Sequence, residues 1–87
     1  MTKAIKFYAD WCGPCKMFAH TIDNLKSEIG DQARIIKINV DKNQALSGKY
    51  QVRGVPTFII FKDGQLVWRQ SGIVKKEELI NIINKFS

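Results

Sequence analysis

The spacing of hydrophobic residues along the first half of the chain predicts two strands separated by a helix. Residues 3–8 alternate between apolar and polar side chains enough to form a strand, and apolar side chains recur at every second position over residues 34–40, which is the spacing of a β-strand. In the second segment Ile36, Ile38 and Val40 share one face. Two strands connected through a helix favour a parallel pair, because two parallel strands cannot be joined by a short hairpin turn.

The segment between these strands has the three- and four-residue spacing of an amphipathic helix. Pro14 suits the first turn of this helix, because a helix leaves its first N–H groups without a partner and proline has none. Gly30 follows the last apolar position and is a typical helix stop. The predicted buried stripe consists of Cys15, Phe18, Ile22, Leu25 and Ile29.

The second half of the chain predicts a hairpin. Residues 57–61 are almost continuously apolar, as in a strand covered on both faces, and residues 62–65 (KDGQ) form a tight turn. Residues 66–70 then return as the partner strand. Pro56 cannot donate a hydrogen bond to a sheet, so we expect it at the entry to its strand.

Two more helices are expected around this hairpin. A short one begins at Asp41, which with Gln44 resembles a capping pair. The last helix begins near Glu77, and its acidic first turn suits the positive end of the helix dipole. Its expected inward residues are Leu79, Ile80, Ile83 and Phe86.

Together these segments predict an α/β protein with a central four-stranded mixed sheet flanked by helices. The expected order is strand, helix, strand, helix, two hairpin strands and helix (β-α-β-α-β-β-α). A chain of 87 residues is too short to close two hydrophobic cores, so we expect one domain over residues 1–87.

Composition narrows the function classes. The chain is 45% hydrophobic and 25% charged, which argues against disorder, and no apolar run approaches the roughly 20 residues of a membrane span. No targeting segment is visible, so we expect a cytoplasmic protein. The net charge of +6 raises the question of nucleic acid, but the one tight basic pair, Lys75 and Lys76, is followed at once by Glu77 and Glu78. We therefore expect neither a nucleic-acid nor a membrane partner.

The two cysteines, Cys12 and Cys15, carry the candidate chemistry. A C-x-x-C spacing is used by redox dithiols and by half of a zinc site. Cys15 belongs to the buried stripe whereas Cys12 precedes the helix, so we expect an accessible Cys12 and a shielded Cys15. The helix N-terminus favours a thiolate at Cys12. Residues three apart on a helical turn lie about 5 to 6 Å apart, which allows a disulfide.

A zinc site is the weaker interpretation. His20 is the only histidine, and its position on the predicted helix directs it away from the apolar stripe. Even with His20 a fourth ligand would be missing, so we expect no metal.

Several segments resemble the thioredoxin family in register. They are residues 7–17 (FYADWCGPCKM), 37–41 (KINVD), 53–57 (RGVPT), 61–64 (FKDG) and Gly72. The resemblance covers nearly the whole chain, although the family's usual first strand and helix have no counterpart. It implies a minimal thioredoxin-like fold and a thiol-disulfide oxidoreductase that needs no cofactor.

The resemblance also implies roles for single residues. Cys12 attacks a disulfide of a target protein, Cys15 resolves the mixed disulfide, and a thioredoxin reductase resets the pair. In the family, Trp11 and the Gly13–Pro14 turn flank the reactive sulfur. The backbone at Val55 and Gly72 pairs with an extended target segment, and a cis Pro56 presents it. A monomer is expected, although residues 34–40 are an edge strand that could pair with another chain.

Lys6 departs from the family pattern, because it stands where these proteins keep a buried acid behind the second cysteine. If Lys6 is buried and cationic it stabilises thiolate and lowers the pKa of both thiols. The alternatives are a depressed pKa of Lys6 itself, or a side chain that extends to solvent and has no role. Lys37 matches a family lysine that normally faces that acid, so the two lysines should repel each other.

Two other functions compete with this interpretation. One is a glutaredoxin-like carrier that depends on glutathione, and the Gly13–Pro14 pair argues against it. The other is a binding module that uses the same surface without redox chemistry. Of the two aromatic neighbours, Tyr8 is expected in the core, and Trp68 is expected to pack on the hairpin.

Overall fold

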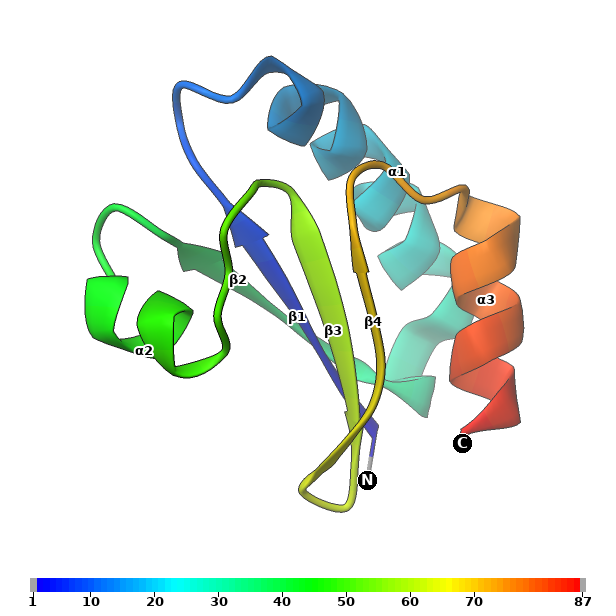
Figure 1. Ribbon diagram of the computed structural model, residues 1–87. Coiled ribbons are helices and arrows are strands. Elements are labelled where there is room, and N and C mark those ends of the chain that lie inside the picture. Colours follow the sequence, from blue (N-terminus) through cyan, green and yellow to red (C-terminus); the bar gives the residue numbers. More distant parts are fainter. Residues whose placement is uncertain (1, 87) are drawn as a thin grey trace.

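The computed structural model describes residues 2–86, which form four strands and three α-helices on a single sheet (Figure 1). The strands are β1 (Thr2–Tyr8), β2 (Arg34–Asn39), β3 (Thr57–Lys62) and β4 (Gln65–Ser71). The helices are α1 (Gly13–Ile29), α2 (Gln44–Lys49) and α3 (Lys76–Lys85), and a 3-10 turn (Gly30–Gln32) follows α1. The fold class, the element order and the mixed sheet predicted from the sequence are confirmed.

The sheet has the order β2-β1-β3-β4. β1 and β2 are parallel, while β3 runs antiparallel to both β1 and β4. The hairpin between β3 and β4 turns at Asp63 and Gly64, both with positive φ, which is the backbone that matches the twist of a two-residue hairpin. β2 lies at one edge of the sheet, with Arg34 and Lys37 exposed on it, as expected.

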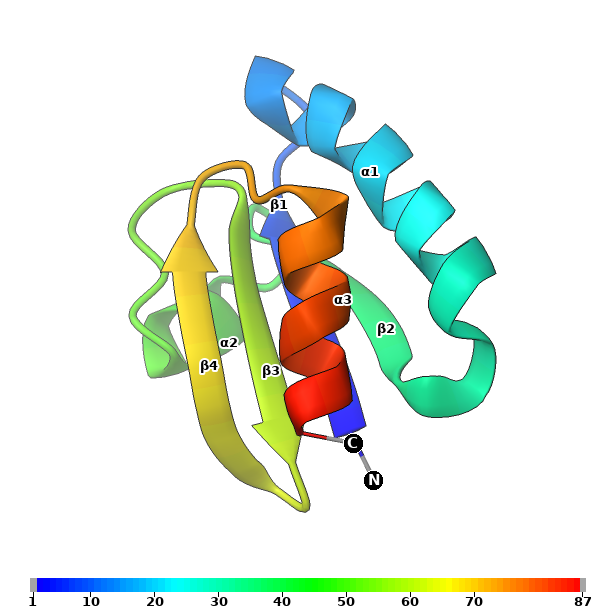
Figure 2. The same ribbon diagram turned by 90° about the vertical axis from the view of Figure 1, so that its right-hand side faces the viewer.

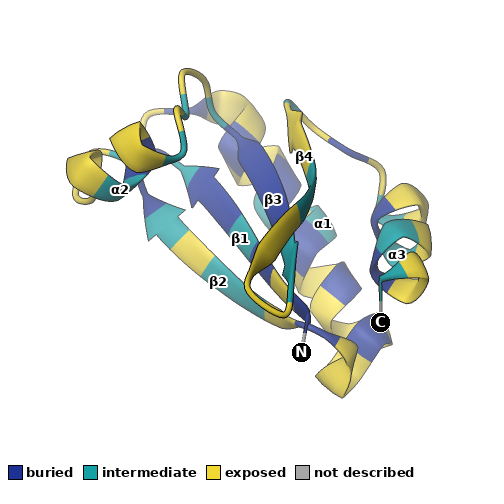
Figure 3. Ribbon diagram, turned by 60° about the horizontal axis from the view of Figure 1, so that its bottom comes forward, coloured by how far each residue is buried: buried dark blue, intermediate teal, exposed yellow. Residues whose placement is uncertain are grey.

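One face of the sheet is covered by α1 and α3, which lie side by side across it (Figure 2). The whole predicted stripe of α1 is buried, and α1 ends at Gly30, as the sequence predicts. This core is continuous from the helices to the central strands, which Figure 3 shows as the darkest part of the sheet. Its fully buried members include Ala4, Phe18, Ile22, Leu25, Phe58, Ile60, Leu79 and Ile83.

The opposite face is covered more thinly. Tyr50, the residue that ends α2, packs its ring against Phe7 of β1 and Phe61 of β3, with ring centroids 6.3 and 5.5 Å apart. Arg69 of β4 donates hydrogen bonds to the carbonyl oxygens of Tyr50 and Gln51, which fixes the end of α2 to the sheet. α2 is thereby held beside the loop that leads to Pro56.

Several local expectations are wrong. α2 begins at Gln44 rather than Asp41, because the Asp41 carboxylate accepts a hydrogen bond from Trp11 and does not cap the helix. Ile80 packs against the core as expected but is only half-buried, and Phe86, just after α3, is half-buried as well. Tyr8 is also half-buried because it lies at the end of β1, where the sheet opens toward the cysteines.

Candidate active site

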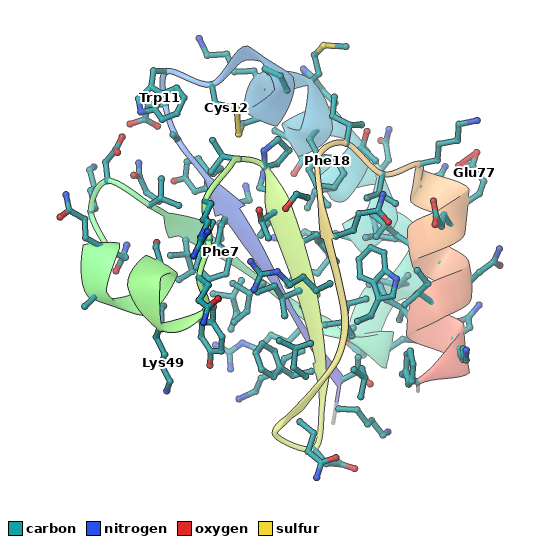
Figure 4. All side chains as sticks on the ribbon, in the orientation of Figure 1. Phe7, Trp11, Cys12, Phe18, Lys49 and Glu77 are labelled. Atoms are coloured by element: carbon teal, nitrogen blue, oxygen red, sulfur yellow. A yellow bond between two sulfur atoms is a disulfide. The ribbon has the colours of Figure 1, made fainter. Side chains whose placement is uncertain are left out.

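The cysteines lie beyond the carboxyl end of β1, where the chain turns into α1. Figure 4 shows Cys12 at the start of α1 with Trp11 beside it. Cys12 is the N-cap residue of the helix, with the extended backbone expected of a cap, and Pro14 occupies the first turn. Crevices outside the carboxyl ends of parallel strands commonly hold the binding sites of α/β proteins. The sequence-predicted start of the helix is confirmed to within one residue.

Cys12 and Cys15 form a disulfide, with their Cα atoms 5.2 Å apart. The backbone N–H of Cys15 donates a hydrogen bond to Cys12 Sγ over 3.1 Å, so the sulfur takes the place of a capping oxygen. The spacing argument for a closable pair is therefore confirmed. One helical turn brings both sulfurs and a polarised amide to the same point.

The expected difference in exposure is wrong. Cys12 is 4% exposed and Cys15 is 3% exposed, so both are buried in the disulfide form. Cys12 is covered because the loop before β3 folds over it, which brings the Val55 carbonyl oxygen to 3.6 Å from Cys12 Sγ. Tyr8, Val40 and Val55 pack around the small cluster formed by Ala9 and the two cysteines.

The two cysteines differ in surroundings rather than in exposure. Cys12 lies outside the helical turns and contacts the Val55 loop. Cys15 lies inside the helix and borders a separate pocket with Lys6.

Trp11 projects from the same loop and is 70% exposed, the largest exposure among the bulky hydrophobic residues of the described part of the chain. Its indole N–H donates a 2.8 Å hydrogen bond to Asp41, which fixes the ring beside a small pocket of about 110 Å³. Val40 and Val55 also line this pocket. Trp11 is thus held in an exposed position beside Cys12, whereas Trp68 packs its ring on Phe58 of the core, as expected.

Asn39 is a residue that sequence reasoning missed. It is buried at the end of β2, where its side-chain oxygen accepts a 2.9 Å hydrogen bond from the Asp41 amide. Its side-chain nitrogen donates to the Asp10 carboxylate over 3.3 Å. Asn39 therefore connects the two loops that carry Trp11 and its partner Asp41. The sequence gives no distinctive signal for Asn39, because β2 also contains the polar residues Arg34 and Lys37.

The loop before β3 places Val55 and Pro56, two of the predicted target-binding residues, beside the disulfide. The Val55–Pro56 peptide bond is cis. Gly72, with φ of 90°, donates its N–H to the Pro56 carbonyl oxygen over 2.8 Å. The Gly72 amide is therefore already used inside the protein. The Val55 amide, in contrast, donates no hydrogen bond to any residue in the range 2–86.

Lys6 is buried, with only 2% of the residue exposed, so its side chain does not extend freely into solvent. Its side chain faces α1 because Lys6 alternates with Phe7, which faces Tyr50 on the other side of the sheet. Burial first, and then the charge of Lys37 on the adjacent strand, hold the pKa of Lys6 below its usual value. The structure thus supports the alternative of a depressed lysine pKa.

No cluster of three metal-binding side chains is present among residues 2–86. His20 is exposed on α1, on the side away from the buried stripe.

None of the α-helices within residues 2–86 has the length and apolar character required to cross a bilayer.

A redox-closable cysteine pair at a helix N-terminus, on a mixed sheet of this order, defines a thiol-disulfide oxidoreductase. The sequence model of the thioredoxin family matches residues 2–85. The chain is similar to thioredoxin of Bacillus subtilis, with 47% identity over 79 residues that cover 91% of this chain and 76% of the relative. It is also similar to thioredoxin of Haemophilus influenzae, with 44% identity over 81 residues, 93% of this chain and 76% of the relative.

Solved structures agree with the sequence comparison. Thioredoxin of Fasciola hepatica superposes with a TM-score of 0.89 at 35% identity and covers 99% of this chain and 81% of its own. Malaria parasite thioredoxin-2 superposes with a TM-score of 0.95 at 30% identity, over 98% of this chain and 82% of its own. The chain belongs to the thioredoxin family.

Proposed function

We propose that this protein reduces disulfides of target proteins by two successive thiol-disulfide exchanges. In the reduced form the Cys12 thiolate attacks a target disulfide, forms a mixed disulfide and releases one target sulfur as a thiolate. Cys15 then attacks Cys12 Sγ, which restores the internal disulfide and releases the second target sulfur. The target disulfide gains two electrons, and the cysteine pair loses these two electrons and is thereby oxidised.

The capping of α1 by a sulfur atom is the observation that carries this proposal. The Cys15 N–H that donates to Cys12 Sγ in the disulfide is available to the same sulfur as a thiolate, and hydrogen bonds to charged acceptors are stronger. The helix dipole adds to this stabilisation. Both effects favour Cys12 as the attacking group, because the thiolate is the nucleophile.

The target segment is proposed to lie along the Val55 loop. The free Val55 N–H and the Val55 carbonyl oxygen near Cys12 Sγ offer a donor and an acceptor to an extended chain, as an added strand requires. Gly72 contributes through its tight turn against Pro56 rather than through its own N–H. Trp11, Gly13 and Pro14 complete the contact surface around the sulfur.

The partners follow from this chemistry. An electron carrier of this kind needs a reductase, and we propose a thioredoxin reductase that returns two electrons to the Cys12–Cys15 disulfide. We propose a monomer, because one chain supplies every group of the site. The cytoplasm is the proposed location, since a reductant of protein disulfides has to be kept reduced and reducing compartments do so.

An insulin-reduction assay with dithiothreitol or a thioredoxin reductase as electron source tests the proposal. The wild-type protein should accelerate insulin reduction, and Cys12→Ser should abolish the acceleration. Cys15→Ser, reduced beforehand and incubated with insulin without dithiothreitol, should instead accumulate a mixed disulfide with insulin that added dithiothreitol releases. The exposed His20→Ser serves as the matched control and should retain full activity. Full activity of Cys12→Ser, or a mixed disulfide formed on Cys15 in that variant, would refute the assignment.

A further inference from the structure

A second pocket, of about 230 Å³, lies on the side of the disulfide away from Val55. Its wall contains Cys15 but not Cys12, together with Lys6 and Lys37. Lys6 comes from β1 and Lys37 from β2, and the two residues are register partners on adjacent parallel strands. The pocket therefore places two cations on one side of the resolving cysteine.

Lys6 has no anionic partner in the disulfide form. Among residues 2–86, its ammonium makes no ion pair or hydrogen bond, and it lies 5.4 Å from the centre of the Tyr8 ring. The ammonium is in contact with the pocket, because no fully buried side-chain nitrogen or oxygen of residues 2–86 lacks a hydrogen-bond partner. A largely buried cation without a counter-charge is still unfavourable, so the position favours a negative charge that this form of the protein lacks.

The other charged groups around Lys6 do not supply that charge. On α1, Asp23 acts in favour of the cation while Lys26 acts against it, and Lys16 adds a further positive charge to the pocket. Asp10, in the loop after β1, also lines the pocket, but its carboxylate accepts a hydrogen bond from Asn39. Cys15 is the group on the pocket wall whose capacity to become an anion depends on the redox state, because its sulfur can ionise only when the disulfide is reduced.

We propose that Lys6 is a positioning residue whose ammonium is the counter-charge of the Cys15 thiolate, so that it shifts the redox equilibrium of the pair toward the reduced form. This role rests on the proposed exchange through Cys12 and Cys15. In equilibrium with glutathione, two glutathione thiols transfer two electrons to the disulfide, which gives one glutathione disulfide and the protein dithiol. The proton of Cys15 then leaves to water through the pocket, and the thiolate remains beside Lys6.

A thiolate of Cys15 beside Lys6 affects the direction of electron flow. A stabilised reduced form makes the disulfide easier to reduce and makes the dithiol a weaker reductant. The same thiolate is the nucleophile that resolves the mixed disulfide, so Lys6 also increases the fraction of Cys15 that is ready to attack at neutral pH.

Lys6→Met tests the proposal, because methionine keeps the unbranched stem and removes the charge. Lys3→Met is the matched control, since Lys3 is on the same strand, faces the other side of the sheet and is exposed. The equilibrium constant for reduction by glutathione should fall about tenfold in Lys6→Met, as expected for one nearby opposite charge. This fall corresponds to a midpoint potential lower by about 30 mV. Lys3→Met should stay within about twofold of wild type.

Thiolate absorbance of the reduced protein gives the second measurement. The titration step assigned to Cys15, which is read separately in Cys12→Ser, should move up by about one pH unit in Lys6→Met. Lys6→Arg keeps a cation and should restore the wild-type midpoint. Lys6→Gln is the neutral variant to use if Lys6→Met does not fold.

An unchanged equilibrium constant and an unchanged Cys15 titration in the neutral variants would overturn the role of Lys6. Equal shifts in Lys6→Met and Lys6→Arg would also overturn it, because they would indicate packing rather than charge. Failure of the proposed function is distinguishable, since wild-type protein would then not reduce insulin at all.

Discussion

Removal of the Lys6 charge should stabilise the oxidised protein, in contrast to most substitutions at buried positions. In that form Lys6 is buried, lies beside Lys37 and has no ion-pair partner among the described residues. Lys6→Met retains most of the side-chain volume and removes the cost of keeping a cation out of water. The prediction concerns the disulfide form, where no thiolate can compensate the charge.

The size of the effect follows from the surroundings of the ammonium. Replacement of buried ionic groups by apolar side chains of similar volume is often neutral or stabilises a protein by up to about 4 kcal/mol. We expect a value near the lower end, about 1 kcal/mol, for two reasons. The pocket that Lys6 lines is large enough to admit water, and Asp23 offsets part of the unfavourable charge.

The gain should depend on pH with a definite sign. The pKa of Lys6 in the folded protein lies below its ordinary value of 10.5 because of burial and the Lys37 charge. Between these two pKa values the unfolded chain binds more protons than the folded one, so the wild-type free energy of unfolding gains a contribution as pH rises. The advantage of Lys6→Met is therefore greatest below the folded pKa of Lys6 and disappears progressively as pH approaches 10.5.

Urea unfolding of the oxidised proteins, followed by far-ultraviolet circular dichroism at several pH values, provides the measurement. Lys3→Met controls for the loss of an exposed lysine on the same strand. The reasoning would be refuted if Lys6→Met were less stable than wild type at neutral pH, or if its advantage were the same at every pH up to 10.5.

Three further substitutions test other contacts. Phe18→Ala, in the fully buried stripe of α1, should cost about 3 to 5 kcal/mol in urea unfolding, and a cost below about 1 kcal/mol would contradict the packing described here. Trp11→Ala should change the free energy of unfolding by less than about 0.5 kcal/mol, because the ring is mostly exposed, and should raise the KM for insulin several-fold. An unchanged KM would remove Trp11 from the contact surface. Gly72→Ala should destabilise by about 1 to 2 kcal/mol, since its φ of 90° strains any residue with a Cβ. Gly48→Ala is its control, because Gly48 has open space around its Cα inside α2 and should be neutral or stabilising.

The sequence by itself determined the elements and the core of this protein. The stripe of α1, its start at the Gly13–Pro14 turn and its stop at Gly30 are local properties of the chain, set by helical spacing and by backbone preferences. The strands could also be predicted from the sequence, because the alternation of apolar residues and the Asp63–Gly64 turn depend only on residues close together in the chain. The C-x-x-C spacing was enough to predict a closable cysteine pair, since one helical turn fixes that distance.

Only the tertiary structure decided the surroundings of the two sulfurs. Cys12 is as buried as Cys15 because the loop at Val55, more than forty positions along the chain, folds over it. The same long-range packing turned Asp41 from an expected helix cap into the partner of Trp11, and it used the Gly72 amide inside the protein. The sequence was compatible with a buried or a solvated Lys6, and the packing of β2 and α1 against β1 decides that Lys6 is buried. Burial and charge depend on which distant segments meet, and local spacing carries no information about such contacts.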